Sequence, residues 1–150
     1  METIVVGIDD SRGARAALAW AARHAQSTGS RLRVVYAYEF RVAWIDAYAA
    51  DVPEWSARAR EAAEETLEQV VSDVLEPGAR DEAEIEVVEG SPVDVLHDES
   101  RDAAMLVVGS RGRGGFSGLL LGSVSQRVAQ HAECPVVIVP APAEDSPPSR

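Results

Sequence analysis

The spacing of glycine and serine after an apolar run is the feature of this sequence best suited to chemistry. Gly109 and Gly112 are followed, after nine residues, by Gly122 and Ser123, which gives the pattern G-x-x-G-x9-G-S. The preceding run, Met105–Val108, predicts a buried strand, and helical spacing of apolar residues follows the pattern. A strand followed by a glycine-rich loop and a helix start is a motif that binds anions. The glycines permit positive φ and let the backbone come close to a ligand, and the free amides of the first helical turn point at negative charge. The sequence therefore predicts an anion-binding site with phosphate as the ligand, and nucleotide binding as the function.

The distribution of charge supports this hypothesis. Residues 103–132 contain no Asp or Glu, although the whole chain has 25 acidic residues. The same stretch carries Arg111, Arg113 and Arg127. A loop with arginines and without carboxylates suits an anionic ligand, because guanidinium groups hydrogen-bond phosphate oxygens. The alternative is a flexible surface loop with solvated arginines, and the charge pattern alone leaves both interpretations open.

Composition narrows the class of partner. The net charge of −11 repels nucleic acid and anionic membranes, so we expect neither as a partner. Every basic residue is an arginine, and a Walker-type phosphate loop is excluded because it requires a lysine. An apolar strand begins almost at Met1 and no run has the length of a membrane span, so we expect no signal peptide and a cytoplasmic protein. The one cysteine, Cys134, is expected to be a packed thiol.

Strand-like apolar runs alternate with segments of helical spacing along the chain. The strands are predicted at Thr3–Val6, Leu32–Tyr38, Ile85–Val88, Met105–Val108 and Val136–Val139. This alternation is typical of an α/β fold, a parallel sheet with helices on both faces. Ligands of such sheets bind beyond the carboxyl ends of the strands, at the point where the winding reverses. We therefore predict that the first and fourth strands are neighbours and that their ends line one crevice.

Residues at the ends of the helical segments predict where each helix begins and stops. The expected signals are Ser11 as an N-cap, Gly29 as a stop, Pro53 as a start, Pro77-Gly78 as a stop, Ser91-Pro92 as a start, and a capping box formed by Ser123 and Gln126. In the third helix, Val93 and Leu96 are expected to face inward. The segment 141–150 is rich in proline and polar residues and is predicted to be a disordered tail after a single domain at 1–140.

With these residues placed, the sequence resembles the universal stress protein family. The resemblance is carried by the opening VVGIDDS, by the complete G-x-x-G-x9-G-S signature, and by the closing run HAECPVVIVP. It implies a single-domain, three-layer α/β sandwich with a five-stranded parallel sheet of order 3-2-1-4-5. It also implies a homodimer in which the fifth strands, Val136 to Val139, pair across a two-fold axis.

The glycine signature marks the members of this family that bind ATP, so the resemblance implies ATP, with Mg held as a phosphate-bound ion. By position, the resemblance places Asp9 and Ala37 at the border of the adenosine, with Gly7 and Ile8 beside it. The ribose and phosphates would be approached by Gly109, Arg111 and Gly112. The phosphate chain would be met by Gly122, Ser123 and Val124. The loop 113–121 is expected to be mobile when empty. The segment 41–55 receives no role.

Two other functions remain open at this stage. One is a dimeric interaction protein of the same fold that binds no nucleotide, and the other is an enzyme on a similar sheet. His24, His97 and His131 lie beside no nucleophile motif, so packing explains them better than chemistry. Asp9 and Asp10 are explained by a helix start as well as by a metal. We therefore expect a stress-response regulator with no catalytic residue, no protein-held metal and, at most, slow ATP hydrolysis.

Overall fold

A five-stranded, all-parallel sheet forms the centre of the molecule, with strand order β3-β2-β1-β4-β5. The computed structural model describes residues 1–40, 52–112 and 121–142. The strands are β1 Thr3–Ile8, β2 Arg31–Tyr38, β3 Glu84–Glu89, β4 Met105–Gly109 and β5 Val136–Val139. The predicted order and the predicted neighbourhood of the first and fourth strands are both confirmed, since Val5 of β1 is in register with Leu106 of β4.

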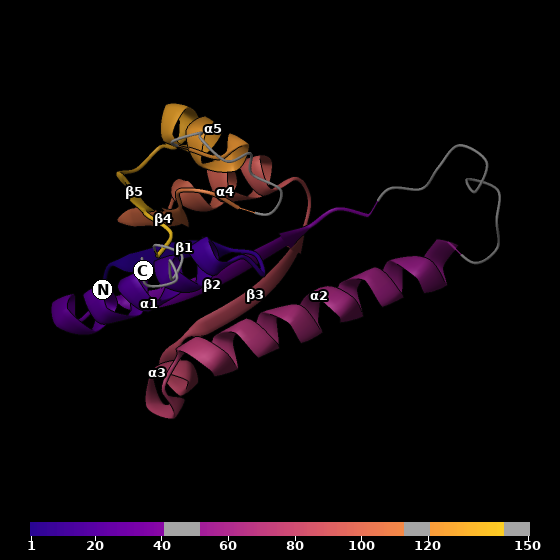
Figure 1. The fold of residues 1–150 in the computed structure, drawn as a ribbon, viewed down its shortest axis with the longest axis horizontal. Helices are drawn as coiled ribbons and strands as arrows, with labels where there is room; N and C mark the ends of the chain where they lie inside the picture. The colour runs from indigo at the N-terminus through magenta and orange to yellow at the C-terminus, as the bar shows by residue number, and fades with distance from the viewer. Residues whose placement is uncertain (41–51, 113–120, 143–150) are drawn as a thin grey trace, which may run out of the picture.

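Helices cover both faces of this sheet (Figure 1). They are α1 Arg12–Thr28, α2 Val52–Val74, α3 Pro77–Glu82, α4 Pro92–Ser100 and α5 Ser123–His131. One buried cluster joins α1 and α2 to the sheet through residues such as Leu18, Val34 and Val71. A second cluster joins α4 and α5 to the opposite face through Leu96 and Val128. Because neighbouring strand residues point to opposite faces, Val5 and Val6 of β1 belong to different clusters.

Several predicted helix ends are confirmed by side-chain and backbone geometry. The Ser11 hydroxyl accepts a hydrogen bond from the Ala14 amide at 3.1 Å, and the Ser91 hydroxyl accepts from the Asp94 amide at 3.2 Å. These bonds satisfy amides that have no partner inside the helix. Gly29 ends α1 with φ of 67°, a left-handed conformation that glycine adopts without steric cost.

The predicted stop of the long helix at Pro77-Gly78 is confirmed, since α2 ends at Val74. The same two residues also begin the short helix α3, which was not predicted, with the proline in the first turn where its missing amide costs nothing. The inward face predicted for α4 is right at Leu96 and wrong at Val93. In α4 the residues buried against the sheet are Val95 and Leu96, whereas Val93 is only partly buried. A nine-residue helix makes little more than two turns, so apolar spacing left its inward face ambiguous.

The two edge strands differ in character. β3 alternates glutamates with apolar residues, as expected for a sheet edge, and β5 is entirely apolar with all four residues partly buried. The described helices include none long and apolar enough to cross a membrane. The predictions for residues 41–51, for the loop 113–120 and for the tail 143–150 lie outside the described residues.

Candidate functional site

A cavity of about 560 Å³ lies at the carboxyl ends of β1, β2 and β4, where the winding of the chain reverses. We call it the carboxyl-edge cavity. Its lining among the described residues is Gly7, Ile8, Asp9, Ser11, Ala14, Val35, Ala37, Pro92, Leu96, Val108, Gly109, Arg111, Gly112, Leu121, Gly122, Ser123, Val124, Ser125 and Gln126.

Every site residue predicted from the sequence lines this cavity. Gly7, Ile8 and Asp9 come from the end of β1 and the residue after it, and Ala37 comes from β2. Gly109, Arg111 and Gly112 come from the end of β4 and the turn after it, and Gly122, Ser123 and Val124 come from the start of α5. The structure therefore brings together segments that lie more than a hundred residues apart in the sequence, but their role in binding a ligand stays a prediction.

The glycines of the signature act differently from the expectation. Among the described residues, only Gly29 and Gly90 have positive φ, so Gly109, Gly112 and Gly122 are not there for a left-handed backbone. They allow close approach instead. A Cβ on Gly109 would lie 2.8 Å from the carbonyl carbon of Gly13, and one on Gly112 would lie 2.8 Å from Oδ2 of Asp9. These glycines therefore let the turn after β4 pack directly on α1 and on the Asp9 carboxylate.

The start of α5 also differs from the prediction. The N-cap is Gly122 and not Ser123, and no side chain caps the helix, so the predicted capping box with Gln126 does not form. Gly122 is extended, with φ of −74° and ψ of 169°, and its carbonyl accepts the first helical bond from the Gln126 amide at 3.0 Å. Ser123 is therefore the first residue of the helix and not its cap. A helix start without a side-chain cap presents its first amides to an anion.

Ser110 connects the turn after β4 to its neighbours. Its carbonyl oxygen accepts hydrogen bonds from the Gly122 amide at 2.6 Å and from the Ser125 hydroxyl at 2.9 Å. Its own amide donates to the Val139 carbonyl at 2.8 Å, and its hydroxyl accepts from the Ala141 amide at 3.4 Å. One residue thus ties the cavity to α5 and to the end of β5.

Part of the cavity wall was not predicted from the sequence. Its apolar side is formed by Pro92 and Leu96 of α4, Val35 of β2 and Val108 of β4, and Ser125 lines it from the first turn of α5. The sequence did contain a signal that α4 lines the cavity, because a helix that follows a parallel strand begins at the carboxyl edge of the sheet. Charge within the described lining is balanced, with Asp9 as the carboxylate and Arg111 as the guanidinium.

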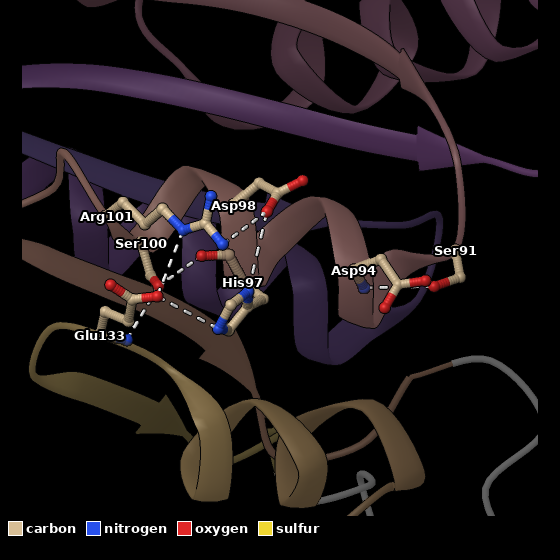
Figure 2. Close-up of polar contacts among 7 residues, drawn as sticks. All are labelled: Ser91, Asp94, His97, Asp98, Ser100, Arg101 and Glu133. Atoms are coloured by element: carbon tan, nitrogen blue, oxygen red, sulfur yellow. Dashed lines mark hydrogen bonds and ion pairs between the residues drawn. The ribbon is translucent and has the colours of Figure 1, made fainter.

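A second group of polar residues lies at the opposite end of the α4–α5 layer. Figure 2 shows the Glu133 carboxylate beside Arg101 and His97, at 3.2 Å from Arg101 Nε and 3.5 Å from His97 Nε2. The Glu133 amide donates to the Ser100 hydroxyl at 3.0 Å. Nearby, Arg33 pairs with Glu84 at 2.8 Å and with Glu99 at 3.1 Å.

We call this group the amino-edge network, made up of Arg33, Glu84, His97, Glu99, Ser100, Arg101 and Glu133. The hydrogen bond to Glu84 raises the pKa of Arg33, and the same bond lowers the pKa of Glu84. Every member of the network makes a hydrogen bond or an ion pair with another member and none lines the cavity, so a structural role explains it. Cys134 lies close by in the sequence, and burial raises the pKa of its thiol, which disfavours the reactive thiolate.

Comparison with known proteins agrees with the fold. The profile of the universal stress protein family matches residues 1–140, and the chain belongs to this family. It is 39% identical over 139 residues to the universal stress protein Rv2623 of Mycobacterium tuberculosis, in a match that covers 91% of this chain and 46% of that protein. The chain thus spans about half the length of that relative.

Two solved structures share the fold at higher coverage. A universal stress protein in complex with cAMP is 28% identical, with a TM-score of 0.56, over 92% of this chain and 95% of the other. The Archaeoglobus fulgidus universal stress protein in complex with dAMP is 26% identical, with a TM-score of 0.57, over 93% of this chain and 98% of the other.

Proposed function

We propose that this protein binds an adenine nucleotide in the carboxyl-edge cavity, with ATP as the ligand that the glycine signature favours. The proposal rests on one observation: all the predicted site residues line a single cavity, and this lining includes the start of α5. The structures with cAMP and dAMP support adenine nucleotides as a ligand class for this fold.

The lining fits a nucleotide in both its parts. The apolar side, with Val35, Ala37 and Leu96, suits the adenine base, because the faces of the base are apolar. The first amides of α5 and the Arg111 guanidinium suit the phosphates. The described residues contain no group of three His, Cys, Asp or Glu side chains that could hold a metal ion, so Mg would be held through the phosphate oxygens.

The same proposal includes a regulatory role in the stress response, in the cytoplasm and without an enzymatic step. Neither nucleic acid nor a membrane is part of it. The protein would act as a homodimer through β5, whose apolar, partly buried residues lie at a sheet edge that a second copy could cover. Light scattering after size-exclusion chromatography tests the dimer, and a monomer at tens of micromolar protein would contradict it.

The direct test is to identify the bound ligand. The purified chain is heated, the extract is chromatographed, and the protein is then titrated with ATP, ADP, AMP and cAMP in the presence of Mg. We expect a co-purified adenine nucleotide or saturable binding of at least one of the four. Absence of both would favour the dimeric interaction protein that binds no nucleotide. ATP turnover above about 1 per second would instead indicate an enzyme.

A substitution locates the binding. Gly122→Leu should reduce nucleotide affinity by more than about tenfold, because its side chain would enter the space beside the first amides of α5. The Cβ itself would lie 3.3 Å from Arg111 Cα and 3.4 Å from the Gly112 nitrogen, so the turn after β4 would also have to shift by a few tenths of an ångström. Gly78→Leu is the matched control, because no atom lies within 4 Å of a Cβ there. Equal affinity of the two variants would contradict the proposed site.

A further inference from the structure

Two polar residues are buried among the described part of the chain, Ser100 at 0% and Ser125 at 3% exposure. Ser100 belongs to the amino-edge network. Ser125 lies in the first turn of α5, two residues beyond the end of the glycine signature, and nothing in the proposed binding of nucleotide uses its hydroxyl. A buried hydroxyl is costly unless it is hydrogen-bonded, so its bonds indicate its role.

The Ser125 hydroxyl holds two backbone segments together. It lies 2.9 Å from the Ser110 carbonyl oxygen and 3.1 Å from the Gly122 carbonyl oxygen, and both are acceptors. A serine has a single hydroxyl hydrogen, which these two carbonyls share. The hydroxyl is therefore committed within the protein and has no hydrogen to donate to a ligand, although Ser125 is one of the residues that line the cavity.

The segments it joins are the two halves of the proposed phosphate subsite. One half is the turn after β4, with Arg111 and Gly112, and the other is the start of α5 from Gly122 onward. They are already in contact, because a Cβ on Gly122 would lie 3.3 Å from Arg111 Cα. The Gly122 amide also donates to the Ser110 carbonyl at 2.6 Å. Donors on both halves can serve one phosphate chain only when their spacing is held within about 0.5 Å.

We propose that Ser125 is a positioning residue for the phosphates of the bound nucleotide. Its hydroxyl fixes the first turn of α5 against the turn after β4, so that amides and guanidinium act on the same phosphate chain. The inference rests on the proposed function for its ligand. The adenosine half of the cavity, formed by β2 and α4, is independent of this hydrogen bond.

The test compares Ser125→Ala with Ser100→Ala, each of which removes one buried hydroxyl from a helix. Titration with adenosine and with ATP gives two affinities, and their ratio measures what the phosphates contribute. In Ser125→Ala we expect the ATP affinity to fall about tenfold and the adenosine affinity to stay within about twofold. In Ser100→Ala we expect the ratio to stay at the wild-type value, since that residue is remote from the cavity.

Ser125→Thr is the rescue variant, because threonine retains a hydroxyl that can bond a carbonyl in the preceding turn of a helix. We expect it to restore most of the ATP affinity. Equal losses for adenosine and ATP in Ser125→Ala, or a loss that Ser125→Thr fails to restore, would overturn the inference.

Amide hydrogen exchange without nucleotide separates this inference from the proposed function. The amides of Gly122 and Gln126 should exchange about tenfold faster in Ser125→Ala than in Ser100→Ala. Unchanged exchange would overturn the positioning role whether or not the wild type binds nucleotide. A wild type that binds neither adenosine nor ATP would overturn the proposed function. Faster exchange in Ser125→Ala would then still support the role of the hydroxyl in holding the two segments together.

Discussion

The two ends of the parallel sheet are held together by different chemical groups. Around the carboxyl-edge cavity the contacts are mostly between backbone atoms, such as the Gly122 amide on the Ser110 carbonyl at 2.6 Å. In the amino-edge network the contacts are between charged side chains, such as Arg101 with Glu133 at 3.2 Å and Arg33 with Glu84 at 2.8 Å. The network satisfies its own charges, whereas at the cavity the start of α5 has no side-chain cap.

This difference has a consequence for tolerance to substitution. Charged side chains at a surface are flexible and their pairs contribute little individually, so one lost partner is replaced by water. Backbone atoms in contact cannot move separately, so an added methyl group forces one segment away from another. The charged pairs of the amino edge should therefore absorb single substitutions that the backbone contacts of the carboxyl edge do not.

The largest expected effect lies at Leu96, which is 4% exposed and forms part of the cavity wall. Leu96→Ala should lower the free energy of unfolding by about 2–5 kcal/mol, measured by urea denaturation. A Cβ on Gly7 would lie 2.6 Å from Leu96 Cδ1, so Gly7→Ala should cost less in the Leu96→Ala background than in the wild type. The same cycle with Leu75→Ala, on the other face of the sheet, should be additive. Additivity in both cycles would contradict the contact between Gly7 and Leu96.

The next effect tests the packing of backbone on backbone at the carboxyl edge. Gly109→Ala places its Cβ 2.8 Å from the Gly13 carbonyl carbon and 2.9 Å from its oxygen, so β4 and α1 must separate. We expect a loss of about 3 kcal/mol in the free energy of unfolding, together with weaker nucleotide binding. Gly78→Ala in α3 is the matched control and should stabilise the protein by about 0.5 kcal/mol. Similar stabilities for the two variants would refute the steric argument.

The two buried serines compare the edges directly. Ser100→Ala removes the acceptor of the Glu133 amide and the donor to the His97 carbonyl, so it should cost about 2 kcal/mol in the free energy of unfolding. Ser125→Ala should cost about 1 kcal/mol, because the Ser110 carbonyl retains its bond from the Gly122 amide. Thermal and urea denaturation measure both. A larger stability loss for Ser125→Ala than for Ser100→Ala would contradict this account of the bonds that the two hydroxyls make.

The smallest effect concerns pH at the amino edge. The Arg33 hydrogen bond lowers the pKa of Glu84 below its ordinary value of 4.5, so the pair stabilises the folded protein above that pH. This stabilisation is lost as the pH falls through the lowered folded pKa. Glu84→Gln should therefore flatten the loss of stability as the pH falls below about 4.5. The difference should stay below about 1 kcal/mol, because the two side chains are 29% and 45% exposed. If the stability of the variant and of the wild type changed with pH in the same way, the pair of Arg33 and Glu84 would not contribute to stability.

Much of the fold follows from local sequence features. The alternation of apolar runs with helical spacing predicted all five strands to within two residues at each end, and Ser11, Gly29 and Ser91 were correctly placed as helix ends. These signals are readable because capping and strand burial depend on a few neighbouring residues. The short helix α3 was missed because proline and glycine favour a turn as strongly as a helix start.

The sequence by itself determined the parallel sheet, its winding and the segments that meet at the carboxyl edge, since these depend on periodicity and on the handedness of crossovers. The family resemblance supplied the complete strand order. Only the tertiary structure decided why Gly109 and Gly112 are glycines, that Gly122 rather than Ser123 caps α5, and that Ser125 joins α5 to β4. These features depend on distances between segments far apart in the chain, and such distances are fixed when the core packs rather than by any local pattern.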